Sequence, residues 1–341
     1  MTTDTLGRRL HDLRISVTDR CNFRCPYCMP AEVFGESYKF LPKGEILTFE
    51  EIARLTRIFA GLGVSKVRVT GGEPLLRTDL HLLIEMLANV DGVEDLTLTT
   101  NGYMLAPRAQ QLKDAGLKRI TVSLDTLDDE IFRQMNGRGF DPTRVLDGIQ
   151  AAETAGLSPI KINSVVQKGV NEHTLVDLAR HFKGTDHIVR FIEYMDVGNR
   201  NGWKWDQVVP AQEIVDLIDA EMPLEPVESN YPGEVANRYR YLDGQGEIGV
   251  IASVTQPFCA GCTRARISTD GQLFTCLFAS RGISLRDPLR DGADDAQMTE
   301  IIAKVWSNRT DRYSEERTDL ASDQNAGQNA PQKVEMYQIG G

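Results

Sequence analysis

The sequence predicts an α/β fold: an incomplete (βα)6 TIM-type barrel with a small C-terminal α+β extension closing its open flank. Two observations support this fold class. Six strand-like segments alternate with helical patterns up to Met195, which is typical of a parallel sheet covered by helices. One face of most of these strands is polar, whereas strands buried on both faces are near-continuous apolar runs. A curved sheet with helices outside and a wet concave side accounts for both observations.

The elements follow one another as strand and helix. The expected strands are Leu13–Asp19, Lys66–Thr70, Asp95–Thr100, Arg119–Thr126, Pro159–Val166 and His187–Met195. Thr48 and Glu51 form a capping box, which begins a helix ending near Leu62. Further helices are expected at Leu105–Ala115, Pro142–Ala155 and Glu172–Phe182. Six units rather than eight leave a barrel open on one flank. An open doubly wound sheet is the alternative architecture. Some of the polar strand residues could also lie in solvent at strand ends.

The pattern changes after Met195. A helix is expected at Gln212–Met222, followed by two hairpins with glycine-containing turns and a last helix at Ala296–Trp306. The chain therefore divides into a barrel, residues 1–222, and an extension, residues 223–341, that closes the flank. Ser314–Val334 is dominated by Asn, Gln, Ser and Asp, which is typical of a loosely ordered tail.

Composition and charge exclude several classes of partner. The chain has 341 residues and a net charge of −11, so it can bury a substantial core but is too acidic for broad nucleic-acid binding. No apolar run reaches the ~18 residues of a transmembrane helix, and the polar segment Met1–His11 lacks the apolar core of a signal peptide. We expect a cytoplasmic protein with no membrane or nucleic-acid partner, whose six cysteines are reduced ligands rather than disulfides.

All six cysteines fall into two groups of three. The first group, Cys21, Cys25 and Cys28, follows the first strand at C-x3-C-x2-C spacing. A tetrahedral thiolate site needs four ligands, so an iron–sulfur cluster held by three cysteines keeps one iron free to bind another molecule. The alternatives are a structural zinc site completed by a distant ligand, or three unrelated thiols.

The second group is Cys259, Cys262 and Cys276. A C-x2-C pair with a remote third cysteine is most often a zinc knuckle, but here again only three thiols are offered. Arg264 and Arg266 follow on a strand and point the same way, so beside a cluster they would clamp an anion or a substrate. A solvated arginine pair on a hairpin is the alternative.

The first cysteine loop, with Tyr27, and the sequence Gly71-Gly72-Glu73-Pro74 after the second strand resemble the radical S-adenosylmethionine superfamily. The resemblance implies that the first triad holds a [4Fe-4S] cluster whose free iron binds S-adenosylmethionine. One electron would then cleave the sulfonium to give a 5′-deoxyadenosyl radical, and the glycine loop would bind the methionyl amino group. The partial (βα)6 barrel of the superfamily agrees with the strand faces.

The ordered motifs over nearly the whole chain resemble one family of radical lyases, the GTP 3′,8-cyclases of molybdenum cofactor biosynthesis. They run from Arg14 to the terminal Gly340-Gly341 by way of Lys66–Pro74, Thr99–Gly102, Ser123–Asp125, Lys161, Arg190–Met195 and the second triad. The resemblance implies hydrogen abstraction at C3′ of the GTP ribose and attack of that carbon on C8 of guanine. The product would be 3′,8-cyclo-7,8-dihydroguanosine triphosphate.

The resemblance also implies site residues. The S-adenosylmethionine site would be lined by Tyr27, Gly72, Ser123 and Met195. The second triad would hold a second [4Fe-4S] cluster, whose free iron contacts guanine. GTP would be contacted by Arg14, Lys66, Arg68, Thr99, Lys161, Arg264 and Arg266, and catalysis would need Arg264, Arg266, Gly340 and Gly341. The residue pattern agrees, because the basic residues on polar strand faces form a cationic pocket, and no P-loop sequence is present to hold a triphosphate.

The implied partners are GTP as substrate, a second copy in a homodimer, an external electron donor and the cyclic pyranopterin monophosphate synthase that takes the product. A twin-cluster radical enzyme that modifies peptides is the second enzyme hypothesis, although such enzymes usually carry more cysteines in the C-terminal extension. The non-enzyme hypothesis is a zinc-stabilised binding module.

Overall fold

The computed structural model of the chain describes residues 2–231, 233–322 and 332–340. Within them one twelve-stranded sheet has the order β12-β11-β10-β1-β2-β3-β4-β5-β6-β9-β8-β7. The first six strands are β1 Asp12–Ser16, β2 Lys66–Thr70, β3 Asp95–Thr100, β4 Arg119–Ser123, β5 Lys161–Val166 and β6 Ile188–Glu193. Neighbours from β1 to β6 are all parallel. The predicted α/β class with a large parallel sheet is confirmed.

The C-terminal part of the chain adds strands to both edges of this sheet. These strands are β7 Leu224–Val227, β8 Asn237–Tyr241, β9 Glu247–Ile251, β10 Arg264–Ile267, β11 Gln272–Phe274 and β12 Ile283–Ser284. β9 runs parallel to β6, and β10 runs parallel to β1. The two predicted hairpins are confirmed as the antiparallel pairs β8–β9 and β10–β11. The parallel part of the described sheet therefore has eight strands, two more than the six expected.

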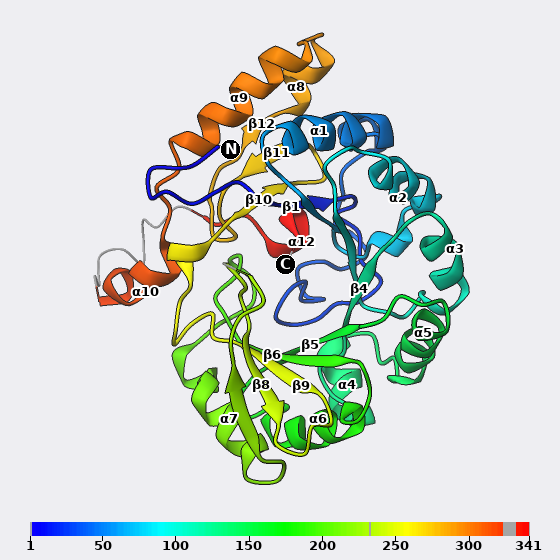
Figure 1. Ribbon diagram of the computed structural model, residues 1–341, viewed down its shortest axis with the longest axis vertical. Helices are drawn as coiled ribbons and strands as arrows, with labels where there is room; N and C mark the ends of the chain where they lie inside the picture. The colour runs from blue at the N-terminus through cyan, green and yellow to red at the C-terminus, as the bar shows by residue number, and fades with distance from the viewer. Residues whose placement is uncertain (1, 232, 323–331, 341) are drawn as a thin grey trace.

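Helices follow most strands and lie on the outer side of the curved sheet (Figure 1). They are α1 Phe49–Gly61, α2 Leu80–Ala88, α3 Ala109–Asp114, α4 Asp129–Asn136, α5 Thr143–Thr154, α6 Leu175–Phe182 and α7 Ala211–Asp219. The predicted capping box is present, because the Thr48 and Glu51 side chains each accept the other's backbone N–H. None of the described helices is long and apolar enough to cross a membrane.

The two faces of the strands have different surroundings: one packs in the hydrophobic core and the other faces the interior cavities. Leu13, Ile15, Val67 and Val69 are fully buried against the outer helices. The alternate residues of the same strands are polar, and several of them line interior cavities. The polar concave side predicted from the alternation is therefore present.

The C-terminal segment differs from the expected loose tail. After α8 Arg286–Arg290 and α9 Asp295–Ser307, the chain forms another helix, α10 Tyr313–Ser322, and then α12 Met336–Ile339. The expectation of a loose tail is wrong for residues 314–322, and residues 323–331 lie outside the described residues. Composition gives no sign of the ionic partner of this segment. Buried Arg317 and half-buried Lys333 both pair with Asp196, at 2.9 and 2.6 Å. α12 lies at the centre of the molecule (Figure 1).

Candidate functional site

The first triad lies in the loop that follows β1. This loop contacts the glycine loop after β2, because the Gly72 N–H donates to the Thr18 carbonyl at 2.7 Å. A Cβ atom on Gly72 would overlap the Arg20 carbonyl, so the close approach requires glycine. The buried Glu73 carboxylate accepts hydrogen bonds from the Thr100 hydroxyl and the Asn101 N–H, both at 2.7 Å. These hydrogen bonds connect the loops that follow β1, β2 and β3 beside the first triad.

A cavity opens beside the first triad. It is lined by Cys21, Cys25, Cys28 and three of the four residues expected at the S-adenosylmethionine site, Tyr27, Gly72 and Ser123. The Tyr27 hydroxyl donates to Asp125 Oδ2 at 2.7 Å, which fixes the ring against β4. Met195 lines the neighbouring cavity beside the second triad.

The donor set at this site fits a cluster better than a single metal ion. The six cysteines are all free thiols, and burial raises the pKa of Cys21 to about 12. A tetrahedral zinc ion with 2.3 Å Zn–S bonds would need sulfurs within about 4 Å of one another. Among the described residues no three His, Cys, Asp or Glu side chains converge in that way. Three thiols without a fourth ligand suit a cluster that offers each thiolate its own iron.

The second triad lies toward the opposite ends of the strands, where β10 begins and β11 ends. Cys259 begins a 3-10 turn, Cys262 lies just before β10, and Cys276 follows β11. Burial raises the pKa of Cys276 to about 11. Burial has the same effect on Cys262, but the Arg264 and Arg309 guanidiniums outweigh it and lower the pKa of that thiol to about 6. Cys262 is therefore prepared to act as a thiolate.

A second cavity lies between this triad and the strand faces. Its wall includes the three second-triad thiols and five residues expected to contact GTP: Arg14, Arg68, Thr99, Arg264 and Arg266. An adjoining pocket adds the other two, Lys66 and Lys161. The cavities beside the two triads share five lining residues, Thr99, Asn163, Val165, Ile192 and Met336. Both triads therefore face one continuous interior.

The charge of this interior is strongly positive. Burial, followed by the charges of Arg68 and Arg264, lowers the pKa of Arg14 to about 9. Burial and neighbouring cations, of which Arg190 is the first, lower the pKa of Lys161 to about 7. Such shifts arise where cations are brought together without enough anions. The pocket therefore favours a polyanionic ligand.

Lys66 is the exception among these cations. Its ammonium lies 3.7 Å from Asp12 and 3.8 Å from Asp95, and it donates to the Tyr231 hydroxyl at 2.8 Å. It can therefore contact a ligand only by sharing or exchanging these partners.

The C-terminal segment reaches this interior. The buried Arg266 guanidinium donates from Nη1 to the Gly340 carbonyl. Gly340 has a φ of +68° and lies against Thr70, where a Cβ atom would overlap the threonine side chain. Gly341, the other terminal residue expected to act in catalysis, lies outside the described residues.

Several residues of the interior were not assigned a role from the sequence. Asn163 and Arg190 lie on the polar strand faces, and the Arg190 guanidinium donates to Asn163 Oδ1 at 2.7 and 3.0 Å. Strand alternation marks these two positions as inward-facing but gives them no function. Arg309, whose Nη2 lies 3.1 Å from Cys262 Sγ, carries no such signal because it follows a helix far along the chain.

Comparison with known proteins agrees with these features. The family model of the Radical SAM superfamily matches residues 15–182, and that of Molybdenum Cofactor Synthesis C matches residues 187–315. A GTP 3′,8-cyclase of Acidothermus cellulolyticus is 56% identical over 318 residues, 92% of this chain and 88% of that protein. A GTP 3′,8-cyclase of Staphylococcus aureus is 48% identical over 339 residues, 99% of this chain and 98% of that protein.

Among solved structures, Streptococcus suis SuiB bound to S-adenosylmethionine is similar, with a TM-score of 0.59. The match covers 86% of this chain and 68% of that chain at 16% sequence identity. At this identity the likeness shows a shared fold only.

Proposed function

The chain belongs to the GTP 3′,8-cyclase family, and from this premise we propose how its residues support the family's reaction. The reaction converts GTP to 3′,8-cyclo-7,8-dihydroguanosine 5′-triphosphate, the first step of molybdenum cofactor biosynthesis. A cluster with S-adenosylmethionine supplies the radical that begins this chemistry. The protein's own residues bind, orient and shield the reactants.

We describe the fold more finely as an incomplete (βα)6 barrel, residues 1–222, with an extension at 223–341. Cys21, Cys25 and Cys28 would hold the first [4Fe-4S] cluster, and Tyr27, Gly72 and Ser123 would line the S-adenosylmethionine site beside it. Met195 remains a predicted contact of that ligand, although it lines the cavity of the second triad. Cys259, Cys262 and Cys276 would hold a second [4Fe-4S] cluster.

GTP would lie between the two triads. The observation that carries this assignment is the continuous interior, which has a thiol triad at each end and a surplus of cations between them. The triphosphate would contact Arg14, Arg68 and Lys161, whose charges lack sufficient anionic partners, with Lys66 at the rim. Guanine would approach the second triad, with Thr99, Arg264 and Arg266 as further contacts.

The C-terminal segment would complete the site. Arg266 holds the Gly340 carbonyl inside the cavity, and we propose that Gly340 and Gly341 keep water from the ribose while Arg264 and Arg266 orient the substrate. A closed interior protects a radical from solvent.

The test is product analysis after anaerobic incubation of reconstituted protein with GTP, S-adenosylmethionine and a reductant. Iron and acid-labile sulfide should correspond to two clusters; zinc without sulfide would contradict the assignment. Arg266→Ala should keep both clusters and cleave S-adenosylmethionine, yet lose cyclisation. Product formation at the normal rate in this variant would rule out the role of Arg266.

The remaining assignments concern partners and location. We propose a homodimer, an external electron donor, and a cyclic pyranopterin monophosphate synthase that takes the product. The six free thiols suit a reducing compartment, and we therefore propose a cytoplasmic location.

A further inference from the structure

Arg309 is a buried cation to which the proposed GTP chemistry gives no task. It lies just after α9, and its side chain is 1% exposed. Its guanidinium donates from Nη2 to Cys262 Sγ at 3.1 Å and from Nη1 to the Cys262 carbonyl at 2.7 Å. From Nε it donates to Asp311 Oδ2 at 2.7 Å. Three nitrogens of one planar group are thus used at once, which only arginine can do.

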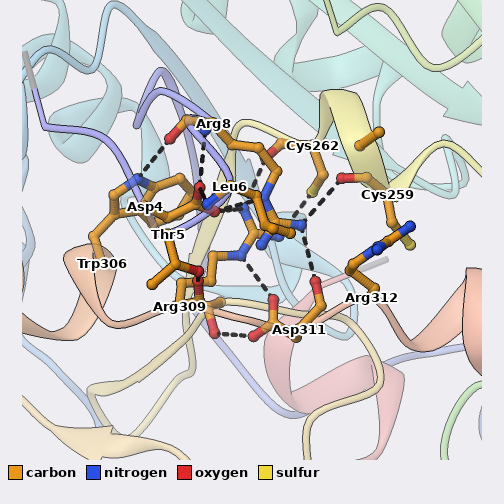
Figure 2. Close-up of polar contacts among 12 residues, drawn as sticks. Asp4, Thr5, Leu6, Arg8, Cys259, Cys262, Trp306, Arg309, Asp311 and Arg312 are labelled. Atoms are coloured by element: carbon orange, nitrogen blue, oxygen red, sulfur yellow. Dashed lines mark hydrogen bonds and ion pairs between the residues drawn. The ribbon is translucent and has the colours of Figure 1, made fainter.

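The N-terminal segment holds this guanidinium in place (Figure 2). Asp4 Oδ2 lies 3.7 Å from Arg309 Nη1 and 2.5 Å from Arg8 Nε. The Thr5 hydroxyl donates to the Arg309 carbonyl at 2.6 Å. Arg8 in turn donates from Nη1 to the Cys259 carbonyl at 3.1 Å. Residues 4–8 therefore contact two cysteines of the second triad, directly or through Arg309.

The Trp306 ring also contacts Arg8 and the Arg309 guanidinium. Its Nε1 donates to the Arg8 carbonyl at 3.1 Å, and the Arg309 guanidinium lies 4.7 Å from the centre of the ring. A guanidinium fixed by carboxylates, a carbonyl and an aromatic face loses little further entropy when it hydrogen-bonds to sulfur.

The charges in this group nearly cancel. Asp4 and Asp311 offset Arg8 and Arg309, so the group adds little net charge beside the triad. Arg309 itself acts on Cys262 through its nearby positive charge and through its hydrogen bond to the sulfur. Hydrogen bonds to ligating sulfurs stabilise the reduced, more electron-rich state of an iron–sulfur cluster and so raise its reduction potential.

We propose that Arg309 is a positioning residue that raises the reduction potential of the cluster at the second triad, and that residues 4–8 hold it for this purpose. This inference rests on the proposed function, since it assumes that Cys259, Cys262 and Cys276 hold a cluster. It assigns a task to an N-terminal segment and to Arg309, which lines the cavity beside the second triad but has no expected contact with GTP.

The experiment is a redox titration of full-length, reconstituted protein, followed by electron paramagnetic resonance. The cluster signal that changes when GTP is added identifies the second site. In Arg309→Gln we expect the reduction equilibrium of that signal to shift about tenfold toward the oxidised form, which is 59 mV for a one-electron couple. Arg309→Lys should shift it similarly, because one ammonium cannot reach Asp311 and both Cys262 atoms.

Arg312→Gln is the matched control. Arg312 is an exposed arginine nearby that pairs with Glu315, and it makes no hydrogen bond to a described cysteine. Removal of Arg312 should leave the reduction equilibrium of the second cluster unchanged. A shift equal to that of Arg309→Gln would overturn the proposal in favour of a general charge effect.

Two further outcomes would overturn the proposal: an unchanged equilibrium in Arg309→Gln with both clusters present, or a wild-type equilibrium in Arg309→Lys. If Arg309→Gln loses the second cluster, judged by its iron and sulfide content, the proposal is tested by the reduction equilibrium of that cluster in Arg309→Lys. A wild-type protein with one cluster, or with no signal that responds to GTP, would instead refute the proposed function.

Discussion

If Lys161 contacts the triphosphate as proposed, its lowered pKa should make GTP binding depend on pH. Burial and the charges of Arg190 and Arg119 lower this pKa to about 7 in the free protein. A bound triphosphate would raise it again, because the nearby anion stabilises the ammonium. Binding therefore takes up a proton above pH 7. This part of the affinity is fully present below the free-state pKa, falls as the pH rises above it, and is lost once the pH passes the raised pKa of the bound state.

The magnitude follows from the protonated fraction. Between pH 7 and pH 8 that fraction falls from about one half to about one tenth for a pKa of about 7. The Kd for GTP should therefore rise about fivefold, close to 1 kcal/mol. Above pH 7 the terminal phosphate, with a pKa near 6, is already ionised and adds little slope. Arg14, with its pKa lowered to about 9, stays largely charged over this range.

The assay is anaerobic calorimetry at pH 7.0, 7.5 and 8.0 in buffers of different ionisation enthalpy, which also counts the protons taken up. Lys161→Gln should bind more weakly at pH 7 and lose the slope, whereas Lys161→Arg should bind without a slope. A flat wild-type profile with no proton uptake, or the wild-type slope retained in Lys161→Gln, would refute the reasoning.

The remaining predictions concern the C-terminal segment, the core and the clusters. Gly340→Ala should abolish product formation, because its Cβ atom would overlap Thr70. Gly139→Ala, at a similar φ of +71° but in open space, should cost only about 1 kcal/mol of stability and keep activity. Glu193→Ala should lower the free energy of unfolding by about 3–5 kcal/mol in chemical denaturation, because its buried carboxylate accepts four hydrogen bonds. The control Glu225→Ala, in a half-exposed ion pair with Arg240, should cost at most about 1 kcal/mol, and equal losses in the two variants would contradict this. Anaerobic removal of iron should lower the Tm, since ligand binding stabilises the folded state, and an unchanged Tm would argue against bound clusters.

Local periodicity predicted the central strands well. β2 and β3 begin and end at the expected residues, Lys66–Thr70 and Asp95–Thr100. Both the alternation of a strand and the loops that flank it depend on residues that are neighbours in the sequence. The same alternation correctly assigned Arg14, Arg68 and Lys161 to one interior. What it could not supply was the partner of each edge strand, since pairing across the whole chain leaves no local pattern.

The features missed from sequence depend on such distant contacts. The polar N-terminal segment has no periodicity, yet Asp4 and Arg8 are buried because Arg309 and Cys259 lie against them. Residues 314–322 resemble a loose tail in composition, but the Asp196 carboxylate gives Arg317 a buried partner. In both places a charged side chain is stabilised by a partner that only the folded chain brings near.

The pairing of β10 with β1 explains how the chain separates its two triads. The strands are parallel, and Arg14 lies beside Arg266 in their register. The first triad follows the end of β1, whereas Cys262 comes just before the start of β10. The triads therefore lie toward opposite ends of this strand pair, and a five-residue strand such as β1 spans about 16 Å. A space of that length admits a nucleotide, with the arginines of both strands pointing into it. The same pairing that completes the sheet thus sets the distance across which the two cysteine sites would act on one substrate.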